Sequence, residues 1–294
     1  MQNIYTDLAY ERYKTNPDLP GCRYEEEALG LCHLHTLYIE NEEAQRATGC
    51  TVGTYRTLFF PSIATAGEYE LEEIIEHLAS LLARKTKKLL GEDHVGKRIL
   101  IAALGNRNMT ADAVGPRAAD GVCATAHLKE CKPDLLNRLH CAEIALLSPG
   151  TLAQSGIESA ELITAAADLF HPHLVIAIDA LAARATERLA TTIQITDTGI
   201  SPGAGIGNPR AALSHATLGC PVISIGAPTV VNAATLTMDL LDRIRGKISK
   251  NERERLAAVA RDFFVSSREA DIISTRYATV IAQAINRTFG VPHL

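Results

Sequence analysis

The chain has 294 residues, of which 47% are apolar and 21% charged, with a formal net charge of −5. This composition excludes a disordered chain, and the mild acidity argues against non-specific nucleic-acid binding, which depends on basic surface. No run of about 18 apolar residues occurs, and the N-terminus lacks the pattern of a signal peptide. We therefore expect a cytoplasmic protein with no direct nucleic-acid or membrane partner.

In chain order, residues 1–20 are polar and predict an irregular N-terminal arm. Period-two alternation over 31–39 predicts a strand, and residues 54–60 predict another that ends at Pro61. Residues 71–90 predict a long amphipathic helix, opened by acidic and closed by basic side chains, as the helix dipole favours. The N-terminal part is therefore expected to be rich in strands.

The rest of the chain alternates apolar strands with helical segments. The strand at 99–104 is followed by a turn and by a helix, and we expect Thr110 or Asp112 near the N-cap of that helix. Further strands are predicted at 141–147, 174–178, 192–195 and 221–226, and helices at 159–169, 231–245, 250–263 and 267–288. Alternating strands and helices without a linker or repeat indicate one α/β domain over 1–294.

Three aspartates end or directly follow apolar strands: Asp112, Asp179 and Asp197. The crevice beyond the carboxyl ends of the strands is the usual active site of an open α/β sheet. Two neighbouring carboxyl groups do not both ionise readily, so one can act as a base on water and the other as an acid. Each aspartate can equally serve as a helix cap or a turn residue.

Other site types find little support in the sequence. The loop at 203–207 reads GxGxG rather than GxGxxG, and no GK[ST] pair occurs, so we expect no nucleotide cofactor. Histidine pairs at 33/35 and 171/173 lack a clear third ligand, so we expect no metal site. The seven cysteines lack CxxC spacing and are expected to be free thiols, mostly packed as small apolar residues.

Several of these segments resemble the germination protease family of spore-forming bacteria. The resemblance covers nearly the whole chain and is carried by residues 6–9, 104–116, 155–158, 175–184, 192–200, 218–223 and 226–231. It implies an endopeptidase that initiates the degradation of small acid-soluble spore proteins during germination. The expected fold is a three-layer sandwich with a mixed, mostly parallel sheet, similar to hydrogenase-maturation peptidases, plus an N-terminal β-rich elaboration.

The resemblance also implies an aspartic-type mechanism, because the two proposed catalytic aspartates of the family match Asp112 and Asp179. Asp197 lies in a family motif, but we assign it no catalytic role. A homotetramer, a zymogen and a location in the forespore and spore core are implied as well. Only five residues precede Thr6, so we expect a very short pro-segment or none.

Two alternatives remain open at this point. One is a metal-dependent, maturation-type peptidase that uses strand-end carboxylates and a histidine. The other is a spore-protein binding module without catalytic activity, against which the presence of both Asp112 and Asp179 argues. An assay for cleavage of an acid-soluble spore protein separates the second from an enzyme, and a chelator separates the first from a metal-free aspartate mechanism.

Overall fold

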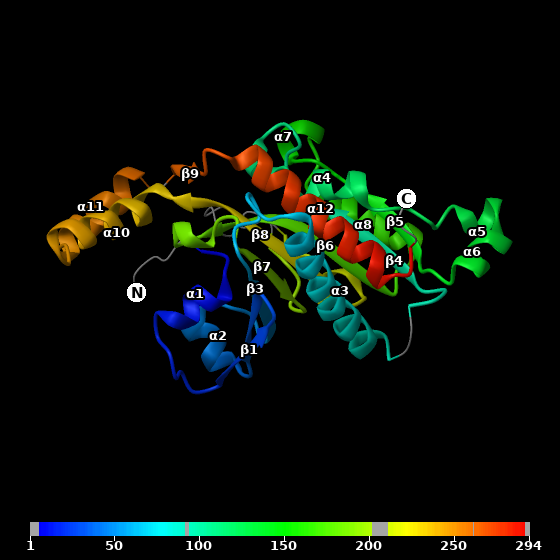
Figure 1. The fold of residues 1–294 in the computed structure, drawn as a ribbon, viewed down its shortest axis with the longest axis horizontal. Coiled ribbons are helices and arrows are strands. Elements are labelled where there is room, and N and C mark those ends of the chain that lie inside the picture. Colours follow the sequence, from blue (N-terminus) through cyan, green and yellow to red (C-terminus); the bar gives the residue numbers. More distant parts are fainter. Residues whose placement is uncertain (1–5, 92–93, 202–210, 261, 292–294) are drawn as a thin grey trace.

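The structure is a computed structural model that describes residues 6–91, 94–201, 211–260 and 262–291. The strands in these ranges are β1 (Cys22–Leu29), β2 (Cys32–Ile39), β3 (Gly53–Phe59), β4 (Arg98–Ala103), β5 (Glu143–Leu147), β6 (Leu174–Ala183), β7 (Thr192–Thr196), β8 (Val222–Asn232) and β9 (Phe264–Ser266). They form one sheet in the order β1-β2-β3-β7-β8-β6-β4-β5, and β9 pairs with β8. Helices pack on both faces of this sheet (Figure 1).

The sheet is mixed, as predicted, but it is not mostly parallel. Among the described strands, the pairings of β8 with β6, β6 with β4, and β4 with β5 are parallel, and the other five are antiparallel. The reason is that the expected β-rich N-terminal part, β1 to β3, extends the main sheet through antiparallel pairs. Strand β3 joins β7 edge to edge, with Tyr55 opposite Thr196 and Phe59 opposite Thr192.

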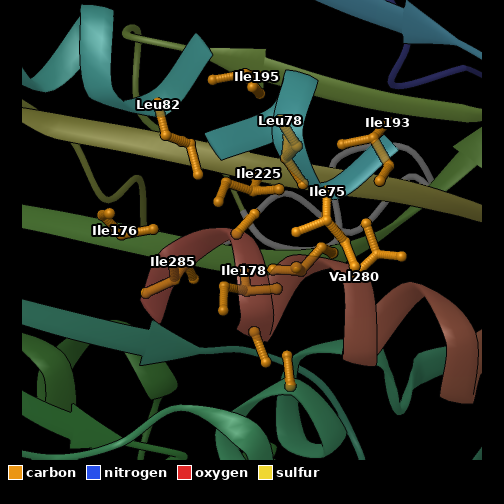
Figure 2. Close-up of a cluster of buried hydrophobic side chains, with 14 of the residues drawn as sticks. Ile75, Leu78, Leu82, Ile176, Ile178, Ile193, Ile195, Ile225, Val280 and Ile285 are labelled. Atoms are coloured by element: carbon orange, nitrogen blue, oxygen red, sulfur yellow. The ribbon is translucent and has the colours of Figure 1, made fainter. Parts of the chain in front are cut away.

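One face of the sheet is covered by α3 (Glu68–Leu90), α4 (Val114–Gly121) and α12 (Ala270–Thr288). Helices α3 and α12 cross this face side by side (Figure 1). Their aliphatic side chains meet isoleucines of β6, β7 and β8 (Figure 2). Leu78 and Ile178 in this cluster are completely buried. The core is thus mainly aliphatic, with Phe60, Tyr277 and Phe289 as its aromatic members.

The opposite face carries a smaller core that includes α8 (Ser159–Phe170) and the short helix α9 (His215–Leu218). Side chains of a strand point alternately to the two faces, so Ile99 and Ile101 of β4 join the first core while Leu100 and Ala102 join the second. The expected arrangement of helices on both sides of a sheet is therefore present. Where α8 and α9 do not cover this second face, the sheet is left as the floor of a cavity.

The remaining helices lie at the periphery. Helices α10 (Ala233–Arg245) and α11 (Lys250–Ala260) project at one end of the molecule, and α5 (Leu128–Cys131) and α6 (Pro133–Leu139) lie at the other (Figure 1). The short helix α2 (Glu42–Thr48) connects β2 and β3, and α7 (Leu152–Ser155) lies between β5 and α8. No helix among the described residues is long and apolar enough to cross a lipid bilayer.

The N-terminal segment is less irregular than its polar sequence predicts. Helix α1 (Ala9–Lys14) forms within it, and the side chains of Leu8 and Ala9 are fully buried. Burial against strands far along the chain orders this segment, and the local sequence carries no signal of that burial. The expectation of an irregular arm over 1–20 is therefore wrong for residues 9–14.

Candidate functional site

A cavity of about 530 Å³ opens on the second face of the sheet. Its floor consists of strand residues that share this face: Asp179 and Leu181 of β6, Gln194 and Thr196 of β7, and Ser224 and Gly226 of β8. Asp112 and the N-terminal Asp7 also line it. Volumes of about 300–1,000 Å³ are typical of ligand pockets, so this cavity is large enough to hold part of a substrate.

Asp179 lies inside a strand rather than at its end. Strand β6 continues to Ala183, because β8 pairs with it along its whole length past the aspartate, so the predicted end of this strand at 178 is wrong. The Asp179 side chain is 8% exposed, and its Oδ1 accepts a hydrogen bond from the backbone N–H of Ala180 at 2.9 Å. The strand therefore holds the carboxyl group rigidly on the cavity floor.

Asp112 ends a 3₁₀ turn, Thr110–Asp112, which precedes α4. Both residues lie near the N-cap of that helix, as predicted, and the N-cap position itself is occupied by Ala113 without a side-chain hydrogen bond. The backbone N–H of Asn106 instead donates to both the carbonyl oxygen of Asp112, at 3.0 Å, and its Oδ2, at 2.9 Å. Asp112 is thereby fixed in the loop after β4, with its side chain at the cavity.

Two glycines make this loop possible. Gly105 has φ of +114°, and a β-carbon there would lie 2.1 Å from the Asp112 carbonyl oxygen. A β-carbon on Gly115, in the first turn of α4, would lie 2.1 Å from the carbonyl oxygen of Leu104 and 2.8 Å from that of Ile178. Only glycine permits these close approaches. This explains why glycine occupies positions 105 and 115 of the segment GNRNMTADAVGP.

The same contacts bring the two aspartates together. The backbone N–H of Leu104 donates to the carbonyl oxygen of Ile178 at 2.8 Å. Leu104 directly precedes Gly105, which touches Asp112, and Ile178 directly precedes Asp179. The hydrogen bond between Leu104 and Ile178 and the contact of Gly105 with Asp112 therefore hold the two backbone segments together. Both sequence-predicted residues, Asp112 and Asp179, line the same cavity.

Asp197, the third strand-end aspartate, is not among the described residues that line the cavity. Its Oδ1 accepts a hydrogen bond from the N–H of Thr54 at 2.8 Å, and its Oδ2 forms an ion pair with Lys85 of α3. These contacts join three elements of the fold. These contacts give Asp197 a structural role, and the sequence analysis assigned it no catalytic one.

The histidine pairs do not belong to this site, since none of the four is among the described lining residues. His33 is exposed on β2, and the ring of His35 packs 4.5 Å from that of Phe59. His173 accepts a hydrogen bond from the N–H of Arg98 through Nδ1, at 3.0 Å. In the part of the chain that the structure describes, no three His, Cys, Asp or Glu side chains group as metal ligands would.

The cysteines are free thiols, as predicted. Cys50 alone of the seven is found among the described cavity-lining residues. Burial raises the pKa of Cys50, with a smaller opposing effect of Arg12, and burial raises that of Cys32 to about 12. A thiol with a raised pKa is a poor nucleophile at neutral pH, so Cys50 is suited to packing rather than to attack on a substrate.

Ser201 also lines the cavity and was not singled out from the sequence. Residues 199–203 read Gly-Ile-Ser-Pro-Gly, the spacing of a GxSxG nucleophile elbow. That motif needs a histidine base, and no histidine is among the described residues that line the cavity. The glycine-rich loop at 203–207 lies outside the described residues.

Sequence analysis missed three further polar residues of the cavity: Asp7, Gln194 and Ser224. Ser224 is 3% exposed, and its Oγ has no hydrogen-bond partner among the described residues. The sequence does mark two of them. Gln194 lies between Ile193 and Ile195, and Ser224 lies between Ile223 and Ile225 in β8. A polar residue at one position of an alternating strand marks a face that is not packed on the core.

Comparison with known proteins gives one consistent result. The chain matches the family described as germination protease over residues 2–266. The germination protease of Caldanaerobacter subterraneus subsp. tengcongensis is 35% identical, over 96% of this chain and 93% of that protein. That of Clostridium tetani is 34% identical, over 97% and 94%. That of Bacillus pumilus is 40% identical, over 82% of this chain and 67% of its own length.

Proposed function

The chain belongs to the germination protease family, and on that premise we propose that it is an endopeptidase in which Asp112 and Asp179 activate water. Its substrates are the small acid-soluble spore proteins, whose degradation it initiates during germination. The observation that carries the mechanism is the placement of both carboxyl groups at one cavity by the close contact of the Asp112 loop with β6.

In the proposed reaction one carboxyl group is ionised and the other holds a proton, a division of roles that neighbouring carboxyl groups favour. The carboxylate accepts a proton from water while the water oxygen attacks the carbonyl carbon of the scissile peptide bond. The second group donates its proton to the departing amide nitrogen as the C–N bond breaks. The first group then holds a proton and the second is ionised, so the two groups have exchanged roles when the next turnover begins.

The cavity favours an extended, unstructured peptide as substrate. About 530 Å³ accommodates a few residues but not a folded domain, so the segment to be cut must be free of its own tertiary structure. A spore protein that orders on DNA would present no such segment while bound. We therefore expect free acid-soluble spore proteins to be cleaved and DNA-bound ones to be protected.

The test is cleavage of a purified acid-soluble spore protein by the full chain, followed by mass spectrometry. Asp112→Asn and Asp179→Asn should each lower kcat by about 10²–10⁴-fold, the usual contribution of one proton-transfer group, without loss of folding. Asp120→Asn is the matched control, because Asp120 is exposed and pairs with Arg107 on the surface. Near wild-type turnover by either active-site variant would remove that residue from the mechanism.

Four further properties are proposed on the family resemblance alone. They are assembly into a homotetramer, synthesis as a zymogen, a location in the forespore and spore core, and a fold related to hydrogenase-maturation peptidases. Light scattering of the purified chain tests the first, and a monomeric mass at micromolar concentration would contradict it.

A further inference from the structure

One hydroxyl group on the cavity floor has no hydrogen-bond partner in the protein. Ser224 of β8 is 3% exposed, and it lines the cavity together with Asp112 and Asp179. Its Oγ makes no hydrogen bond with any described residue. A buried hydroxyl group without a partner costs folding free energy, because it has given up its hydrogen bonds to water. A molecule that binds in the cavity can supply the missing partner.

The neighbours of Ser224 in the sheet leave its hydroxyl group unpaired. Ser224 lies opposite Thr196 of β7 and opposite Ala177 of β6. The hydroxyl group of Thr196 is already engaged, because its Oγ1 lies 2.9 Å from Oγ1 of Thr198 and accepts the Thr198 N–H at 3.2 Å. Ala177 carries only a methyl group. The Ser224 hydroxyl group can therefore bond with an occupant of the cavity without breaking a hydrogen bond of the fold.

Ser224 lies near Asp179 on the same face of the sheet. Gly226 is opposite Asp179, and Ser224 precedes Gly226 by two residues along β8. Two residues of a strand span about 6.6 Å and neighbouring strands lie about 4.8 Å apart, so the two backbone positions are roughly 8 Å apart. An extended peptide covers that length in two or three residues. A peptide whose scissile bond lies at Asp179 therefore reaches Ser224.

We propose that Ser224 is a substrate-binding residue whose hydroxyl group donates a hydrogen bond to a backbone carbonyl oxygen of the bound peptide. An ionised carboxylate accepts hydrogen bonds but cannot donate them, whereas a hydroxyl group does both. An extended peptide presents a carbonyl oxygen at every residue, and Ser224 offers a donor beside the carboxyl groups. The inference rests on the proposed peptidase function and extends it to a residue that transfers no proton to the scissile bond.

The first test is Ser224→Ala in cleavage of a free acid-soluble spore protein. Loss of one hydrogen bond to the peptide should raise KM by about 3- to 10-fold. The value of kcat should stay within about twofold, because the bond is made equally in the ground state and the transition state. Without substrate, Tm should be unchanged or higher, since alanine removes a buried hydroxyl group that has no partner. A purely structural role predicts the opposite, a lower Tm with unchanged KM.

Ser224→Thr and Ser224→Val form a matched pair, because threonine and valine have nearly the same shape and differ in the hydroxyl group. The threonine variant should have a KM about 3- to 10-fold below that of the valine variant. Equal KM values in this pair would overturn the inference. So would a KM of Ser224→Ala within twofold of the wild type, or a loss confined to kcat.

Thr86→Val is the control for removing a buried hydroxyl group as such. Thr86 of α3 is also 3% exposed, and its Oγ1 likewise has no hydrogen-bond partner among the described residues. It is not one of the described residues that line the cavity. We expect KM and kcat of this variant within about twofold of the wild type. A rise in KM equal to that of Ser224→Ala would show that contact with the substrate is not the cause.

A binding measurement separates this inference from the proposed mechanism. In an Asp179→Asn background, Ser224→Ala should weaken binding of a fluorescent spore-protein peptide, measured by anisotropy, by the same factor as it raises KM. Unchanged binding together with unchanged KM refutes the role of Ser224 alone. Full activity of Asp112→Asn and Asp179→Asn would instead refute the aspartate pair, whatever Ser224 does.

Discussion

Lys85 of helix α3 and Asp197, the residue after strand β7, form an ion pair in which the lysine is only 3% exposed. The second oxygen of the carboxylate accepts the N–H of Thr54, at 2.8 Å. One aspartate therefore connects α3, β7 and β3. The pair lies at the junction where the N-terminal strands join the rest of the sheet, which gives the acidic residue of this motif a structural reason.

Asp197→Leu should lower the free energy of unfolding by about 3–5 kcal/mol, because it leaves a buried ammonium group without its partner. Burial already lowers the pKa of Lys85, and Asp197 opposes that shift. The measurement is urea denaturation. The double variant Lys85→Met/Asp197→Leu removes both charges and should regain part of the loss. Equal stability of Asp197→Leu and the wild type would show that the pair is unimportant.

Gly115→Ala should impair both stability and catalysis. The new β-carbon would collide with the carbonyl oxygens of Leu104 and Ile178, so α4 must shift and carry the Asp112 loop with it. We expect a loss of about 1–3 kcal/mol in stability, and up to about 10²-fold in kcat from misplacement of the carboxyl group. Gly67→Ala is the control, since a β-carbon there makes only an ordinary contact at 3.8 Å with Glu70.

His35 should make the N-terminal strands sensitive to acid. Burial lowers its pKa, with a smaller opposing effect of Glu26. The unfolded chain therefore binds a proton more readily than the folded one, and stability must fall as pH drops below about 6.5. His35→Phe should lose less stability than the wild type between pH 7 and pH 5 in urea titrations. An unchanged slope in His35→Phe would exclude His35 as the source.

Cleavage should survive removal of metal ions, because two carboxyl groups can activate water without a Lewis acid. The chain is dialysed against a strong chelator and assayed with an acid-soluble spore protein. Activity within about twofold of the untreated enzyme is expected. Loss of activity that one particular divalent ion restores would favour the metal-dependent alternative.

Much of the fold could be predicted because the signals were local. The apolar run at 99–104 and the alternation at 192–195 identify β4 and β7 to within a residue. Strand β1 was missed because it is an edge strand whose run of glutamates, 25–27, points into solvent on both faces. The end of β6 was misjudged because an aspartate in a buried strand looks like the residue that terminates it.

The site was predictable only where a residue follows a recognisable strand in the local sequence. Asp112 and Asp179 each follow an apolar run, so their position at the sheet could be inferred one at a time. Asp7 could not, because its partner Ala182 lies 175 residues away and nothing in the polar segment around it signals burial. Long-range placement of this kind depends on strand order, which periodicity does not encode.

The pairing of β3 with β7 has a consequence for how the chain acquires its fold during synthesis. Phe59 has no partner on that side until Thr192 has left the ribosome. Until then the three N-terminal strands, β1 to β3, expose the unpaired edge of β3. Exposed strand edges can pair with other chains. Closing so long a loop is also slow. Nascent chains that stop before residue 192 should therefore be prone to aggregation, and a chaperone that shields the β3 edge should raise the yield of active enzyme.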